Sequence, residues 1–88
     1  MTYLLDADIC IEFLRGRFGI KERIESVGIE NCCLSEISIA ELTFGAYNSK
    51  NFNKHIEEVK QLQQLFEIIP IKDIFDVYGQ ERTVLKRY

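Results

Sequence analysis

The chain has 88 residues, enough for one small domain that buries about 60–65% of its unfolded surface. Hydrophobic residues make up 47% and charged residues 28% of the chain, an ordinary globular composition that excludes intrinsic disorder as the default. The net charge of −3 excludes attraction of nucleic acid by the whole-molecule field, so any such binding must be local.

The first half of the chain predicts two strands and two helices. Residues 2–5 form an apolar run typical of a buried strand, and Asp6 or Asp8 can cap a helix that ends at Gly16. Residues 19–27 have apolar side chains at helical spacing and predict a second helix. Residues 31–34 predict a second strand.

The second half continues the alternation. A helix is expected from Ser38 to the polar stretch at 48–53, followed by an amphipathic helix at 54–65, a strand at 66–71 and a helix from Asp73 to Arg87. Strands separated by helices predict an α/β fold with a parallel three-stranded sheet and flanking helices. We find no internal repeat or linker, which predicts a single domain over residues 1–88.

Cysteines and apolar runs indicate the compartment. The three cysteines include the adjacent pair Cys32 and Cys33 and form no CxxC motif, which favours reduced, buried thiols. No apolar stretch approaches the roughly 20 residues that span a bilayer, and the first residues do not resemble a secretion signal. A cytoplasmic protein with no membrane partner is expected.

Two carboxylates are expected at one edge of the sheet. Asp6 follows the first strand, and Glu41 lies near the start of the helix after the second strand. Open α/β sheets place their chemistry at the carboxyl ends of the strands. Paired carboxylates there suit Mg²⁺ or Mn²⁺, so the sequence favours metal-dependent hydrolysis of a phosphodiester.

Each of these residues also has a purely structural explanation. Asp6 and Asp8 are good helix N-caps, and Ser38 with Glu41 has the spacing of a capping box. The only histidine, His55, lies among charged residues and is expected to be a solvated helix residue. A basic cluster follows the first acidic turn; its members, Arg15, Arg17, Lys21 and Arg23, either contact RNA or form a solvated helix face.

Two segments resemble known blocks of PIN-domain proteins, in particular VapC-type toxins. Residues 3–11 (YLLDADICI) resemble the first block, and residues 34–46 (LSEISIAELTFGA) resemble the second block with its glutamate. Residues 65–71 and the region around Tyr78 and Gly79 are similar to the third strand and the following helix of the family.

The resemblance implies roles for individual residues. Asp6 matches the first metal-binding aspartate and Glu41 the glutamate of the acidic cluster, so both are implied to be catalytic metal ligands. Ser35 matches a small polar residue that lines the site, and Asp8 replaces the usual asparagine. The implied activity is Mg²⁺- or Mn²⁺-dependent cleavage of RNA, with a cognate antitoxin as partner.

The chain also departs from the family. The family's further aspartates and its last two strands are not found, so the chain is interpreted as a C-terminally truncated PIN-like domain. This interpretation predicts weak metal affinity, impaired cleavage and a bare edge at residues 2–5. A bare edge in turn predicts a homodimer or larger oligomer, through the helices at 9–14 and 54–65 or through the first strand.

Three functions stay open at this point. The chain is an endoribonuclease that receives the missing acids from a second chain, a non-catalytic PIN module that dimerises or binds an antitoxin, or a fragment that folds but has lost its task.

Overall fold

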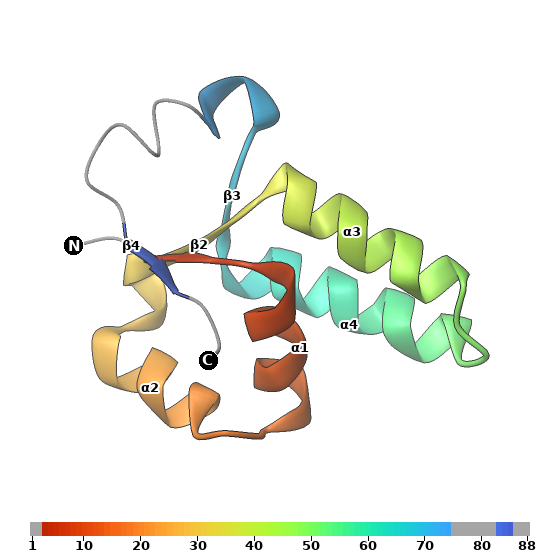
Figure 1. Ribbon diagram of the computed structural model, residues 1–88, viewed down its shortest axis with the longest axis horizontal. Helices are drawn as coiled ribbons and strands as arrows, with labels where there is room; N and C mark the ends of the chain where they lie inside the picture. The colour runs from red at the N-terminus through yellow and green to blue at the C-terminus, as the bar shows by residue number, and fades with distance from the viewer. Residues whose placement is uncertain (1–2, 75–82, 86–88) are drawn as a thin grey trace.

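The computed structural model describes residues 3–74 and 83–85, which contain a sheet of four parallel strands (Figure 1). In chain order, the strands are β1 (Tyr3–Leu5), β2 (Cys32–Ser35), β3 (Glu67–Ile69) and β4 (Thr83–Leu85). The order across the sheet is β3-β2-β1-β4, and every neighbouring pair is parallel. The predicted parallel α/β class is confirmed.

Helices connect the first three strands. They are α1 (Ala7–Arg15), α2 (Ile20–Val27), α3 (Glu36–Tyr47) and α4 (Phe52–Leu65), with 3₁₀ turns at Ile29–Asn31 and Ile71–Asp73. Figure 1 shows α3 and α4 as a hairpin that extends away from the sheet. Over the described ranges, none of the helices combines the length and apolar character needed to cross a membrane.

Local signals define both ends of α1. The Asp6 side chain accepts a hydrogen bond of 2.9 Å from the backbone N–H of Ile9, which satisfies one of the free donors of the first turn. At the other end, Gly16 takes a left-handed conformation (φ 67°), and its N–H bonds to carbonyls of the last turn. Of the two predicted caps, Asp6 rather than Asp8 starts the helix, and the predicted end at Gly16 is confirmed.

The start of α3 differs from the prediction. Ser35, not Ser38, is the N-cap, and its hydroxyl accepts a hydrogen bond of 3.1 Å from the Ser38 N–H. Because the helix therefore starts at Glu36, Glu41 lies in its second turn and cannot reach back to the cap. The capping-box explanation of Glu41 is wrong.

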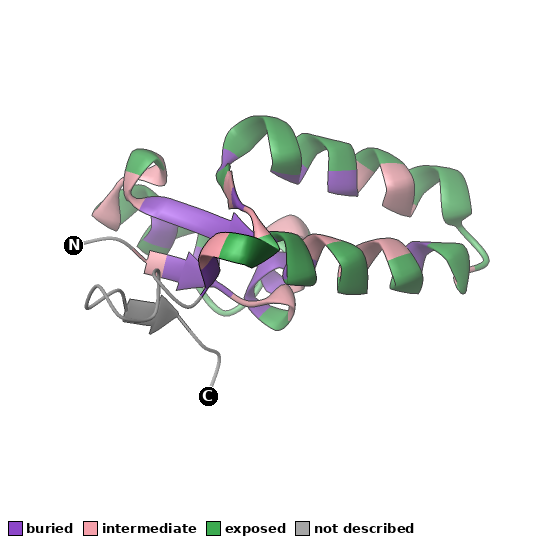
Figure 2. Ribbon diagram, turned by 90° about the horizontal axis from the view of Figure 1, so that it is seen from above, coloured by how far each residue is buried: buried purple, intermediate pink, exposed green. Residues whose placement is uncertain are grey.

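Successive side chains of a strand point to opposite faces of the sheet. Figure 2 shows buried residues along the interior strands β1 and β2, which are covered on both faces. The larger core lies on one face, where Leu5 and Leu34 pack with residues of α1, α2 and α4, including Ile9, Ile24 and Leu62. The other face carries a smaller cluster of four described residues, Leu4, Cys33, Ile69 and Ile74. This arrangement explains why all four residues of β2 are buried.

The structure of the last part of the chain differs from the predicted helix. Thr83–Leu85 is a strand rather than part of a helix from Asp73 to Arg87, and it pairs with β1. Thr83 and Val84 are β-branched residues, which favour a pleated surface. The predicted sheet thus gains a fourth strand, and the predicted bare edge at β1 is wrong. Residues 75–82 and 86–88, which include Tyr78, Gly79 and Arg87, lie outside the described residues.

The structure removes two of the reasons for predicting a homo-oligomer. The edge of β1 is covered by β4, and the apolar faces of 9–14 and 54–65 contribute Ile9, Cys10 and Leu62 to the core of the chain itself. Homo-oligomerisation stays a prediction.

Candidate functional site

The carboxyl ends of β1 and β2 bring two of the predicted site residues to one edge. Leu5 lies opposite Leu34 in the register, and the residues that follow, Asp6 and Ser35, lead directly into α1 and α3. Each caps its helix, so each has a fixed orientation. The Ser35 hydroxyl also lies 3.4 Å from that of Ser38, a buried residue that the sequence analysis did not assign to the site.

Capping and metal binding are compatible at Asp6. The hydrogen bond from Ile9 occupies one position on Oδ1, whereas an ionised carboxylate has about four acceptor positions. Asp6 is also partly exposed, so its remaining positions are not sealed in the core. The chemistry of this carboxylate suits a hard cation such as Mg²⁺.

The charge of Asp6 acts on a neighbouring thiol. Burial raises the pKa of Cys10 to about 12, and the negative charge of Asp6 acts in the same direction. Cys10 is therefore a neutral core residue and contributes no nucleophile to the site.

This pKa predicts alkaline destabilisation of the fold. The folded pKa of about 12 lies above the ordinary value of 9.0, so the neutral thiol stabilises the fold below pH 9, and this contribution is lost as the pH rises toward 12. We expect urea midpoints between pH 8 and 11 to fall less steeply with pH in Cys10→Ala than in the parent. Ile9→Val, a neighbouring core change with no titrating group, should keep the parental slope; equal slopes in all three would contradict the assignment.

A cavity of about 590 Å³ lies between α1, α3 and α4. Its lining mixes apolar and charged side chains, from Ala7, Asp8, Ile11, Leu14 and Arg15 of α1, Glu41, Leu42, Gly45 and Ala46 of α3, Ser49 of the connection, and Lys54, His55, Glu58, Val59 and Leu62 of α4. Small residues at Ala7, Gly45 and Ala46 leave space where larger side chains would fill it. A cleft with a few polar groups is the usual form of a binding site.

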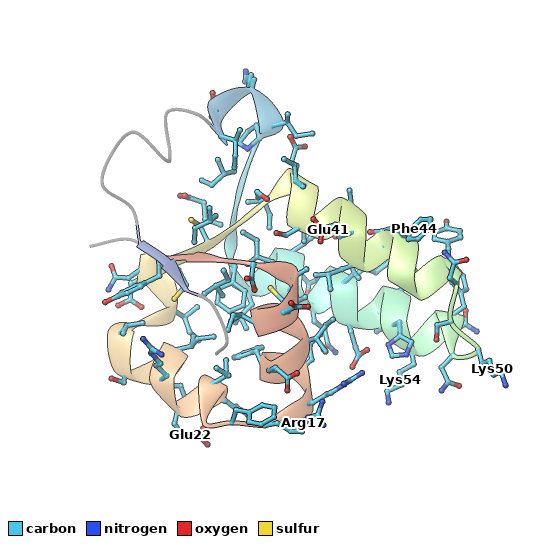
Figure 3. All side chains as sticks on the ribbon, viewed as in Figure 1. Arg17, Glu22, Glu41, Phe44, Lys50 and Lys54 are labelled. Atoms are coloured by element: carbon cyan, nitrogen blue, oxygen red, sulfur yellow. The ribbon has the colours of Figure 1, made fainter. Side chains whose placement is uncertain are left out.

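Glu41 and Asp8 bring acids to this cavity. Both are exposed and line it from different helices, α3 and α1. Figure 3 shows Glu41 on the half of α3 nearer to the sheet. Asp6 is not among the lining residues, but it immediately precedes Ala7, which is. The structure thus brings Asp8 and Glu41 to one cavity, with Asp6 and Ser35 at the adjoining sheet edge.

The opposite charge comes from Arg15 and Lys54, and His55 lies next to Lys54 in the same lining. Arg15 closes α1, and Lys54 and His55 lie in the first turn of α4. His55 was expected to be solvated, but it is partly buried, and its Nδ1 lies 2.7 Å from Glu58 Oε1. The amphipathic pattern of α4 does not predict that His55 lines the cavity, because this position depends on α4 folding back against α3.

The other three residues of the predicted basic cluster lie beyond the end of α1. Arg17 is half-exposed, and its Nε lies 3.2 Å from Oε2 of the buried Glu12. Lys21 and Arg23 are exposed on α2. Of the four predicted RNA contacts, only Arg15 lines the cavity.

The described residues offer only part of a metal site. Within residues 3–74, no group of three or more His, Cys, Asp or Glu side chains is placed to hold a metal ion. Asp6 and Glu41 fit a divalent cation in chemistry, and Mg²⁺ is often held by one or two carboxylates together with water and phosphate oxygens.

Comparisons with known proteins agree with the sequence blocks. The PIN-domain family profile matches residues 3–82. The solved structures with a similar fold include DNA-bound VapBC from Salmonella typhimurium, with a TM-score of 0.69 and 24% identity. They also include VapBC2 from Rickettsia felis bound to a DNA fragment from its promoter, with a TM-score of 0.72 and 26% identity. A third is VapBC-1 from nontypeable Haemophilus influenzae, with a TM-score of 0.63 and 25% identity. A search of curated protein sequences gives no significant match.

Coverage in these comparisons is unequal. The matches span 80%, 91% and 98% of this chain, but only 53%, 63% and 72% of the Salmonella, Rickettsia and Haemophilus chains. This chain therefore spans little more than half the length of the first. The likeness to VapBC structures confirms the VapC-type resemblance, and the profile match, which covers nearly all of the chain, shows that it belongs to the PIN-domain family.

Proposed function

We propose that this chain is a VapC-type, metal-dependent endoribonuclease of a toxin–antitoxin system, with weak activity from its own residues. The observation that carries the proposal is that two acids, Asp8 and Glu41, line one cavity from different helices. A third acid, Asp6, lies at the adjoining sheet edge, directly after β1. Membership of the PIN family supports metal-dependent hydrolysis as the reaction at this site.

Asp6 and Glu41 are the proposed metal ligands. Bound Mg²⁺ or Mn²⁺ would supply a Lewis acid for the phosphodiester and lower the pKa of a water molecule. Asp6 is held by its capping hydrogen bond, and Glu41 projects from a rigid helix. Two carboxylates leave most of the coordination sphere to water and substrate, which is why we propose weak binding and slow turnover.

The basic side chains would hold the RNA backbone. Arg15 and Lys54 border the same cavity as the acids, and Arg17, Lys21 and Arg23 extend the positive charge along the turn and α2. Local cations of this kind can bind phosphates despite a net charge of −3, because salt screens the acids that lie more than about 10 Å away.

A second candidate is a non-catalytic module that binds an antitoxin or a second copy of the chain. Apolar side chains are exposed on the α3–α4 hairpin and suit a protein partner: Ile37, Phe44, Tyr47, Phe52 and Leu65. The three similar structures are VapBC toxin–antitoxin assemblies, which supports an antitoxin as that partner.

Metal-dependent cleavage tests the first proposal. With Mn²⁺, the purified chain should cut single-stranded RNA slowly, and EDTA should abolish the cutting. Glu41→Gln should reduce the cleavage rate by about 10-fold or more. Mutation of residues that only hydrogen-bond to metal ligands typically lowers metal affinity or activity by about 10–100-fold, and loss of a ligand itself should have at least that effect. Glu57→Gln makes the same charge change at an exposed residue of α4 outside the cavity, and it should leave the rate unchanged.

The outcome separates the two candidates. No cleavage by the parent, together with tight binding of an antitoxin peptide, would favour the non-catalytic module. Cleavage that is equal in Glu41→Gln and the parent would remove Glu41 from the site.

A further inference from the structure

The turn between α1 and α2 holds an aromatic ring in an unfavourable backbone conformation. Phe18 has a φ of 61°, a left-handed conformation that is uncommon for bulky residues, yet its side chain is 66% exposed. Gly16 and Gly19, on either side, are also left-handed. Strain of this kind persists only where the surroundings enforce it, and it is often found at functional sites.

Two interactions define the position of this ring. The Arg17 guanidinium lies 5.6 Å from the centroid of the Phe18 ring, within the range of a cation–π interaction. Arg17 is itself fixed to α1: its Nε lies 3.2 Å from Glu12 Oε2, and its backbone N–H donates to the Glu12 carbonyl at 3.1 Å. Since Glu12 is only 5% exposed, a buried acid orients Arg17, and Arg17 supports the exposed ring.

The ring lies within a basic segment that leads to the cavity. Residues 15–23 contain four cations, Arg15, Arg17, Lys21 and Arg23, against a single acid, Glu22. Arg15, three residues before Phe18, lines the cavity that holds Asp8 and Glu41. Figure 3 shows Arg17 at the α1–α2 turn, far from Phe44 on the α3–α4 hairpin.

We propose that Phe18 is a stacking platform for a base of single-stranded RNA, positioned by the Glu12–Arg17 pair. The inference rests on the proposed function and adds a substrate-binding residue to it. Exposed aromatic rings beside cations are the usual means of binding single strands, because every base has a face that can stack. The excess of cations in residues 15–23 favours a polyanion as the partner. An apolar protein partner is less suited to this segment, because Phe18 is its only exposed large hydrophobic residue.

Binding without metal tests this role separately from catalysis. In EDTA, with a labelled single-stranded RNA of about ten nucleotides, Phe18→Ala should weaken binding by roughly 5- to 150-fold, the range for loss of one stacked base. Phe44→Ala is the matched control, since Phe44 is 73% exposed but lies on α3, and it should bind as the parent does. Phe18→Gly should also lose binding while its Tm rises by a few degrees, because glycine relieves the left-handed strain.

An abasic oligonucleotide of the same length distinguishes stacking from charge. It retains the phosphates, so parent and Phe18→Ala should bind it equally, whereas Arg17→Ala should weaken binding to both oligonucleotides and reduce the salt dependence. The chain has no tryptophan, so Phe18→Trp places a single tryptophan at this position, and excitation at the red edge of indole absorption avoids the tyrosines. Its emission should be quenched by RNA but not by the abasic strand.

Three results would overturn the inference. Equal binding of RNA by the parent and Phe18→Ala would remove the stacking role and leave the proposed function intact. Failure of the parent to bind RNA at all would contradict both. Unchanged RNA binding combined with loss of antitoxin binding in Phe18→Ala would show that the ring contacts a protein instead.

Discussion

Leu34→Ala is expected to lower the free energy of unfolding by about 3–5 kcal/mol, enough to leave a large unfolded population at 25 °C. Leu34 is fully buried in β2, between β3 and β1, and packs in the larger core. Truncation of a buried leucine loses its transfer free energy and leaves a cavity, and small domains have only about 5 kcal/mol in total.

Urea denaturation followed by circular dichroism measures this loss. Leu65→Ala is the matched control, because Leu65 is 43% exposed at the end of α4, and it should cost about 1 kcal/mol or less. Similar midpoints for the two variants would mean that β2 is not the centre of the core.

Asp6→Asn is expected to abolish Mn²⁺ binding and cleavage while leaving the fold nearly as stable as the parent. Asparagine can accept the same hydrogen bond from the Ile9 N–H and is as good an N-cap as aspartate, but it has no charge for a cation. Asp6→Ala loses both functions, and it should also cost about 1 kcal/mol of stability.

The comparison of the two variants separates the roles of Asp6. Isothermal titration with Mn²⁺ and urea denaturation on the same preparations provide both readouts. Undiminished Mn²⁺ affinity in Asp6→Asn would reduce Asp6 to a helix cap and contradict its metal role. Loss of stability in Asp6→Asn as large as in Asp6→Ala would instead show that the charge itself, next to the helix N-terminus, stabilises α1.

Local signals allowed most of the fold to be predicted. The apolar run before Asp6, the glycine at position 16 and the apolar spacing of α4 each act within a few residues, and the elements they indicate are present. The start of α3 was missed, because Ser35 and Ser38 both suit a cap and only the end of β2 decides between them. The strand at 83–85 was missed because its partner, β1, is some 80 residues away in the sequence.

The candidate site was predictable only in its acids. Asp6 and Glu41 stand out by their position after strands and by their resemblance to the PIN blocks. Lys54, His55 and Glu58 join the cavity because α4 folds back along α3, a tertiary event that leaves no local pattern in the sequence. The support of Phe18 by Arg17 and Glu12 was equally hidden, since it depends on the left-handed turn between α1 and α2.

The position of β1 in the sheet has a consequence for biosynthesis. β1 is an interior strand, with β2 on one side and β4 on the other, although it comes first in chain order among the described strands. At translation rates of about 5–20 residues per second, its second partner follows it from the ribosome by several seconds. During that interval an apolar strand edge is open to pairing with other nascent chains. Slower elongation should therefore increase aggregation of this protein, and an early-binding chaperone should reduce it.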